Sequence, residues 1–127
     1  MTRSRIWLAV AVVVVFAVSL FAQEHTVTKV AIVAKPKVYT GPCPADIQFI
    51  ATIFVSRHPV WVDYQWERSD GAKGERQRVE IRSAGQGIYT TWHLGAGREQ
   101  LHIWERLHVL APTGISSPPG NVTVNCR

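Results

Sequence analysis

Residues 46–55 read DIQFIATIFV, and this stretch decides the fold class. Apolar side chains occupy every second position from Ile47 to Val55, which is the period of a β-strand that turns one face toward a core. Isoleucine, valine and phenylalanine are also residue types that favour strands. The same alternation returns over residues 60–68, where Val60, Val62, Tyr64 and Trp66 share one face. The two segments predict strands that each present an apolar face to a common core.

Further out along the chain, period-two apolar segments alternate with clusters of Gly, Pro, Ser and Asp. Ser69-Asp70-Gly71 is typical of a tight turn. No window sustains a long helical apolar stripe; residues 98–110 are the most helix-like, but their β-favouring content and Pro112 favour a strand. The predicted strands are residues 26–34, 46–55, 60–68, 76–82, 87–94, 100–110 and 121–126.

Seven short strands without a helix predict an all-β, two-layer antiparallel sandwich. A single sheet would leave one apolar face in water, so a second layer is expected. A closed barrel is the alternative architecture. The length of the chain, 127 residues, fits one such domain and excludes a multidomain machine or a large α/β enzyme.

The two cysteines, Cys43 and Cys126, predict one disulfide. Carried along their strands, the period-two patterns point both side chains toward the core, which independently favours a bond between them. A metal site or a catalytic thiol is the alternative, but neither cysteine has a second Cys or a His at ligand spacing. The bond would tie the early part of the domain to its last residues.

The N-terminus has the features of a secretion signal. Arg3 and Arg5 precede an uncharged apolar run over residues 6–21, and Ala22 is a small residue at the break. We therefore expect a signal peptide over residues 1–22, a domain over residues 23–127, and a secreted or periplasmic protein with no stable membrane insertion after cleavage. Leu20 is large for its place before the cut, so an uncleaved signal anchor is the alternative.

Charge and motif content argue against several functions. The 14 Lys and Arg outnumber the 9 Asp and Glu, but they are scattered among acids, as on a solvated strand face, so we expect no nucleic-acid partner. The five histidines form no pair at metal-ligand spacing, the serines lack a nucleophile elbow, and no glycine-rich phosphate loop opens a helix. We expect no catalytic residues, no metal and no cofactor.

The chain resembles the small immunoglobulin-like modules of secreted bacterial proteins, most of them of unassigned function. The resemblance rests on the Cys43-Pro44 step before a strand, on residues 62–71 (VDYQWERSDG) and on a cysteine at the end of the chain. Trp66 matches the tryptophan of the third strand, and Cys43 lies near the place of the first cysteine, whereas Cys126 lies on the last strand and not on the sixth. The resemblance implies a seven-stranded immunoglobulin-like sandwich and no catalytic residues.

Within that architecture the strands over residues 60–68 and 100–110 are neighbours in one sheet. Their outward positions hold two tryptophans among polar side chains, which is the composition of a protein-binding or sugar-stacking surface. The candidate binding surface is Trp61, Asp63, Gln65, His102, Trp104 and Arg106. The large inward side chains, predicted to fill the core, are Phe49, Tyr64, Trp66 and Trp92.

The expected function is a non-catalytic module that binds a protein partner, or serves as a structural element, through this aromatic sheet face. The alternative is a carbohydrate-binding sandwich module that stacks sugars on the same tryptophans. The partner and the oligomeric state are left open by the sequence.

Overall fold

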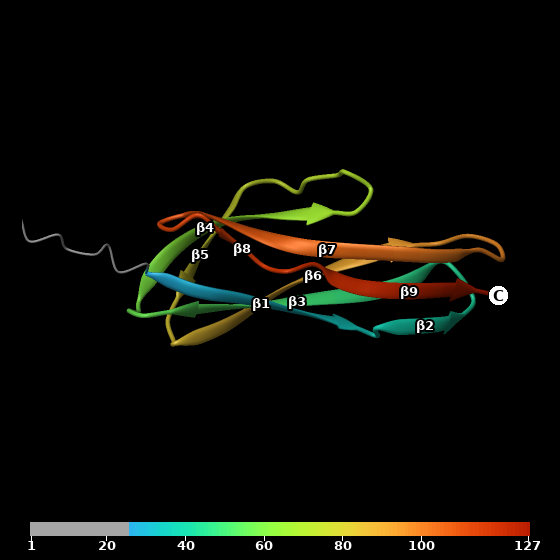
Figure 1. Cartoon of the computed structure of the whole chain (residues 1–127), viewed down its shortest axis with the longest axis horizontal. Helices are drawn as coiled ribbons and strands as arrows, with labels where there is room; N and C mark the ends of the chain where they lie inside the picture. The colour runs from blue at the N-terminus through green and yellow to red at the C-terminus, as the bar shows by residue number, and fades with distance from the viewer. Residues whose placement is uncertain (1–25) are drawn as a thin grey trace, which may run out of the picture.

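A computed structural model describes residues 26–127, which form nine β-strands in two sheets (Figure 1). The fold class is therefore all-β, as predicted, whereas the signal peptide predicted over residues 1–22 lies outside the described residues. The separation into two sheets agrees with a sandwich and not with a closed barrel. The strands are β1 (Val27–Lys35), β2 (Val38–Gly41), β3 (Ala45–Val55), β4 (Val60–Arg68), β5 (Gln77–Ile81), β6 (Gly85–Leu94), β7 (Gln100–Ala111), β8 (Ile115–Ser116) and β9 (Gly120–Cys126).

The prediction of seven strands was wrong by two. Strands β2 and β8 were missed because they have four and two residues, too few for a period-two pattern to register. All seven predicted strands are present with boundaries shifted by a few residues. The segment with helical character is β7, a strand over its whole length.

The first sheet has the order β1-β3-β6, and both pairs are antiparallel. Strand β3 lies in the centre, which explains its strict alternation: Phe49 pairs with Ala34 on one side and with Thr90 on the other. Strand β6 forms one edge of this sheet. We call it sheet one.

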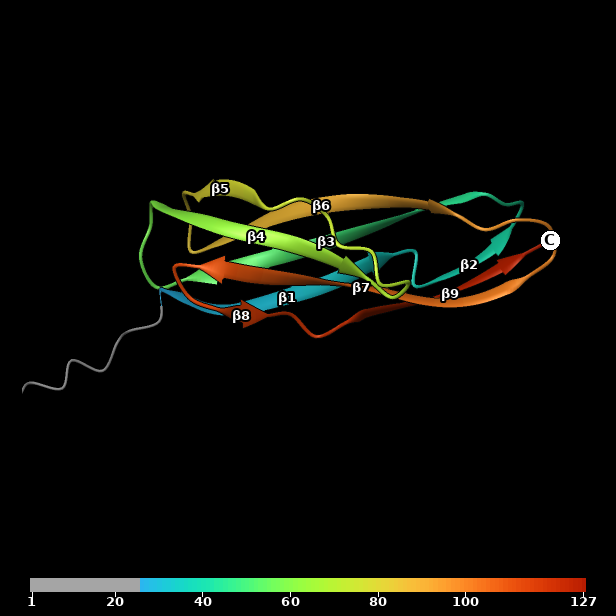
Figure 2. The ribbon, with the colours of Figure 1, turned by 90° about the horizontal axis from the view of Figure 1, so that it is seen from above.

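The second sheet has the order β2-β9-β7-β4-β5, with β8 beside β7. Its pairs are antiparallel except β2 and β9, which run parallel. Because β1 belongs to sheet one and β2 to this sheet, the chain crosses between the layers at Pro36 and Lys37, which lie between the two strands (Figure 2). We call this second sheet, from β2 to β5, sheet two. The predicted adjacency of residues 60–68 and 100–110 is confirmed by the β4–β7 ladder.

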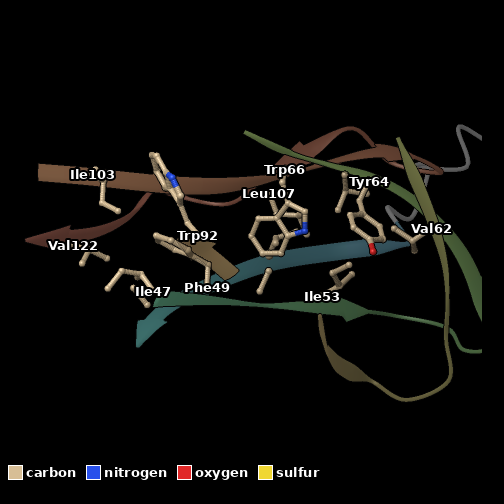
Figure 3. Packing of buried hydrophobic residues seen from close by; sticks show 14 of the residues in the cluster. Ile47, Phe49, Ile53, Val62, Tyr64, Trp66, Trp92, Ile103, Leu107 and Val122 are labelled. Carbon is tan, nitrogen blue, oxygen red and sulfur yellow. The ribbon is translucent and has the colours of Figure 1, made fainter. Parts of the chain in front are cut away.

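The core lies between the sheets and contains the four predicted side chains (Figure 3). Phe49 is fully buried, and Tyr64, Trp66 and Trp92 are each less than a tenth exposed. The Tyr64 hydroxyl donates a hydrogen bond to Gln77 Oε1 at 2.8 Å, and burial raises the pKa of this phenol. The other large side chains that are fully buried are Val27, Ile47, Ile53, Val62, Ile81, Leu107, Val109 and Val124.

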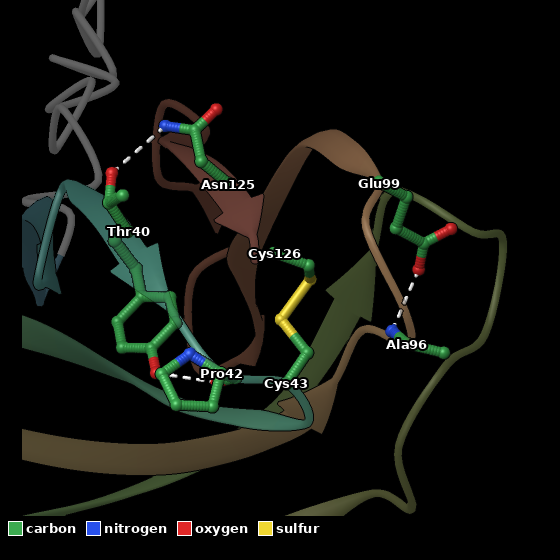
Figure 4. Close-up of a disulfide and its surroundings, with 8 residues drawn as sticks. Thr40, Pro42, Cys43, Ala96, Glu99, Asn125 and Cys126 are labelled. Carbon is green, nitrogen blue, oxygen red and sulfur yellow. Dashed lines mark hydrogen bonds between the residues drawn. A yellow bond between two sulfur atoms is a disulfide. The ribbon is translucent and has the colours of Figure 1, made fainter.

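The disulfide Cys43–Cys126 is present, as predicted, with the two Cα atoms 5.4 Å apart (Figure 4). It joins Cys43, two residues before β3 begins, to the last residue of β9, and Gly95 packs against both sulfur atoms. Short polar contacts surround it: Asn125 donates to Thr40, and the N–H of Ala96 donates to Glu99. A disulfide fits an extracellular or periplasmic protein. Between residues 26 and 127 no helix is long and apolar enough to cross a membrane.

Candidate functional site

All six residues of the candidate binding surface lie on the outward face of sheet two. On β4 the outward residues alternate with the buried Val62, Tyr64 and Trp66. On β7 they alternate with buried Ile103, Glu105 and Leu107. The period-two assignment of faces was therefore correct for both strands. The β-bulge between Asp63 and Tyr64 lies near one end of the β4–β7 ladder, so it does not reverse this assignment of faces.

The register of the ladder separates the two tryptophans of this face. Trp104 lies opposite Ser69, since the N–H of Ser69 donates to Trp104 O at 2.9 Å and the N–H of Trp104 donates to Ser69 Oγ at 3.1 Å. Trp61 pairs instead with Glu80 of β5, at the other end of β4. Eight residues of strand correspond to about 25 Å. The tryptophans share a face but do not touch.

The first group of side chains, the Trp61 cluster, consists of Trp61, Asp63, Arg76 and Arg78. Trp61 is 54% exposed, and the guanidinium of Arg78 lies 5.2 Å from the centre of its ring. Asp63 accepts a hydrogen bond from Arg76 at 3.1 Å and lies 3.7 Å from Arg78. The carboxylate thus binds Arg76 and lies close to Arg78, whose guanidinium faces the exposed indole in a geometry suited to cation–π contact.

The second group, the Trp104 cluster, consists of Trp104, Arg106, His102 and their β9 neighbours Asn121 and Thr123. Trp104 is half-buried, with the Arg106 guanidinium 4.5 Å from its ring centre. His102 Nδ1 lies 3.2 Å from Thr123 Oγ1 across the β7–β9 ladder. A hollow of about 200 Å³ is lined by Trp104, His102, Asn121 and Thr123 of this cluster, and also by Lys37. Sheet two therefore places an indole, an imidazole, an amide and a hydroxyl around one small depression.

Between the clusters lies a row of polar contacts centred on Glu67. Its Oε1 atom is 3.2 Å from His108 Nε2 and 3.4 Å from Arg106 Nε, the latter an ion pair without hydrogen-bond geometry. His108 Nδ1 is 2.5 Å from Ser116 Oγ, and Gln65 donates to the carbonyl of Gly74 at 2.8 Å. Gln65 thus ties the loop at Gly74 to β4.

The outward face of sheet one also carries apolar side chains, and the sequence analysis did not single it out. Tyr89 is 70% exposed and Val33 45% exposed, and both pair with Ile50 across the three strands. The sequence pattern could have identified this face, since period-two alternation over residues 87–94 leaves Tyr89 on the outward side. No charged side chain aligns with this row in the register, in contrast to the arginine-lined tryptophans of sheet two.

Within residues 26–127 no group of three or more His, Cys, Asp or Glu side chains is arranged to hold a metal ion. The five histidines predicted not to share a metal site include His25, which lies outside the described residues.

Comparison with solved structures finds a similar fold in the CARDB domain of the PF1109 protein from Pyrococcus furiosus, solved in complex with di-metal ions. The match has a TM-score of 0.54 and 12% sequence identity, and covers 78% of this chain and 93% of that chain. At this identity the likeness concerns the fold, a β-sandwich. A scan against protein-family models finds no match, and a search of curated proteins finds none either.

Proposed function

We propose that this chain is an exported, non-catalytic, immunoglobulin-like module that binds a protein partner through the outward face of sheet two. The observation that carries the proposal is the pair of tryptophan–arginine contacts, Arg78 on Trp61 and Arg106 on Trp104, on one sheet face. Tryptophan and arginine are the residue types most enriched among the side chains that dominate protein interfaces. Export is supported by the N-terminal sequence and by the disulfide.

The spacing of the clusters matches the size of a protein interface. A standard interface covers about 800 Å² on each partner, which is a patch roughly 28 Å across. The separation of about 25 Å between Trp61 and Trp104 fits inside such a patch. A small ligand would reach one cluster only, whereas a folded partner would contact both at once.

The arginines also bear on the carbohydrate alternative. Sugar rings stack on an open aromatic face, and in both clusters a guanidinium already lies over the indole. This favours a protein partner. The observation in favour of a glycan is the hollow beside Trp104, where His102, Asn121 and Thr123 offer polar groups next to the ring. A glycan array probed with the domain tests this second function, and glycan binding that is lost in Trp104→Ala but kept in Trp61→Ala would support it.

The test of the protein-binding function compares three variants in one affinity experiment. Trp61→Ala and Trp104→Ala each remove one anchor of the proposed face, and Tyr89→Ala removes a more exposed aromatic side chain from the opposite sheet. A partner identified with the unaltered domain should bind each tryptophan variant about 30-fold or more weakly, since interface anchors are worth about 2 kcal/mol or more. Tyr89→Ala should bind with unchanged affinity. Weakening by Tyr89→Ala alone would move the interface to sheet one.

A further inference from the structure

Glu105 is a charged residue on the inward face of a strand. It lies on β7 between the buried Ile103 and Leu107, and it is only 2% exposed. Among the described residues its Oε2 atom is buried without a hydrogen-bond partner. Buried carboxylates are ordinarily paired or hydrogen-bonded, so an unpartnered one calls for an explanation.

A pocket of about 230 Å³ is lined by Glu105 together with residues of both sheets. Strand β5 begins only at Gln77, and residues 69–76 form a loop, so the end of β4 is left without a β5 neighbour. Strand β6 is the edge of sheet one. The walls come from β4, the start of β5, β6, β7 and the loop, and consist of Trp66, Arg68, Ala72, Lys73, Gly74, Gln77, Thr90, Thr91, Trp92 and Glu105.

The nearest fixed cation in the pocket is already engaged. Arg68 lies over the Trp92 ring at 4.3 Å and forms a two-point ion pair with Asp70, in which its Nε donates to Oδ1 at 3.2 Å. The hydrogen bonds from Arg68 and from the N–H of Ala72 lower the pKa of Asp70, so this pair stays ionised and neutral overall. Arg68 makes no ion pair with Glu105 within the described part of the chain. The remaining cation, Lys73, is solvent-exposed at the rim.

Burial makes the Glu105 carboxyl group a weaker acid. It raises the pKa of Glu105 to about 7; the charge of Arg68 works against this rise and that of Asp70 adds to it. A positively charged group placed in the pocket would reverse the effect of burial, because it would supply both the missing hydrogen bond and a counter-charge. The walls already provide acceptors and donors in Gln77, Thr90 and Thr91.

We propose that this pocket binds a primary ammonium group, with the carboxylate of Glu105 as its counter-ion. An ammonium donates hydrogen bonds and carries positive charge. It would therefore supply both the donor and the counter-charge that the unpartnered Oε2 atom of Glu105 lacks. The volume suits a group the size of an amino-acid side chain and not a whole drug-sized ligand. The ammonium has two possible sources, a free small amine or a lysine side chain of a segment lying along the β6 edge. This site is independent of the outward face of sheet two.

The first experiment uses n-butylammonium and, as its neutral counterpart of similar size, n-pentanol. Carbon-13 NMR of the labelled Glu105 carboxyl group, recorded over a pH series, follows binding at the site itself. We expect saturable binding of butylammonium, a fall in the pKa of Glu105, and an affinity that rises between about pH 6 and pH 8 as the carboxylate forms. Pentanol should not bind. Equal binding of both probes, or binding of neither, would overturn the proposal.

Two variants complete the test. Glu105→Gln keeps the shape of the side chain and should lose about tenfold or more in butylammonium affinity, measured by calorimetry on protein shown to be folded. Lys73→Ala removes the cation at the rim and should bind equally well or better. Loss of binding in Lys73→Ala together with unaltered binding in Glu105→Gln would contradict the proposal.

The source of the ammonium is separated with an extended peptide that carries one central lysine and with the same peptide acetylated on that lysine. Tighter binding of the unmodified peptide than of butylammonium, with amide shifts along β6, indicates a segment of a partner. Equal affinity of the unmodified peptide and of butylammonium indicates a free amine. Preference for the acetylated peptide would overturn the proposal.

Discussion

Gly95 packs directly against the sulfur of Cys126. A Cβ atom at position 95 would lie 2.8 Å from Cys126 Sγ and 2.9 Å from Cys43 Sγ. Gly95 also has a φ of +95°, in the left-handed region that side chains disfavour. Position 95 therefore requires glycine for two separate reasons, and one of them is the disulfide itself.

Gly95→Ala should destabilise the domain by about 2 kcal/mol or more, through positive φ and through the clash with the sulfurs. Gly97→Ala is the matched control, since Gly97 has a φ of +59° but nothing within 4 Å of its Cβ position. It should cost about 1 kcal/mol. Urea denaturation of both variants measures the difference, and equal losses would refute a steric role of the disulfide.

The double variant Cys43→Ala with Cys126→Ala should lose about 4 kcal/mol of stability. The bond has a sequence separation of 83 residues, and closing so long a loop restricts the unfolded chain strongly. Chemical denaturation of the variant beside the oxidised parent tests the figure. Intact-mass analysis with and without reduction should show no free thiol in the parent before reduction.

Trp66→Ala and Trp61→Ala should differ in their effects. Trp66 is 6% exposed in the core, and its truncation should cost about 3–5 kcal/mol. Trp61 is 54% exposed, so its truncation should cost less than about 1 kcal/mol. Thermal or urea unfolding compares them. A large loss from Trp61→Ala would assign that side chain a structural role and would weaken the proposed binding face.

The stability of the domain should fall as pH rises from about 4.5 to 7 because of Glu105. Its pKa is about 7 in the folded state, against an ordinary 4.5, so the unfolded state ionises first as pH rises. The fold loses about 3 kcal/mol over this interval and nothing further above it. Glu105→Gln should abolish this fall, whereas Glu75→Gln in the exposed loop should keep it. Urea midpoints across the pH range measure the effect, and a fall that persists in Glu105→Gln would contradict the assignment.

Period-two patterns predicted most of the fold because this sandwich buries one face of nearly every long strand. Ile47 to Val55 on β3 shows this most clearly, since the predicted inward residues are all buried. The same reasoning placed both cysteines on the core side, and the disulfide joins them.

What the sequence left open was register. Side-chain alternation assigns Trp61 and Trp104 to one face, but it contains no information on how β4 slides against β7. Hydrogen bonds between distant strands set that register, so the separation of the two clusters emerged only from the ladder. Strand β2 is too short to show a period-two pattern, and it too depends on a distant partner, since Val38 to Gly41 pair with β9 at the other end of the chain.

Glu105 was visible in the sequence and was passed over. It shares the parity of Ile103 and Leu107, so a period-two reading of β7 places an acid in the core. A charged residue at an inward position is more informative than the apolar residues around it, because burial of a charge is costly unless something compensates.

The position of the disulfide also determines how the domain would respond to stretching. The start of β1 and the C-terminus lie at opposite ends of the molecule (Figure 1). A tension applied across them would run through β1 and β2 to Cys43 and pass at once to Cys126, so residues 44–125 would bear no load. The mechanical extension is then limited to residues 26–43, roughly 60 Å of chain. Under force the bond therefore confines the extensible part of this module to its first two strands.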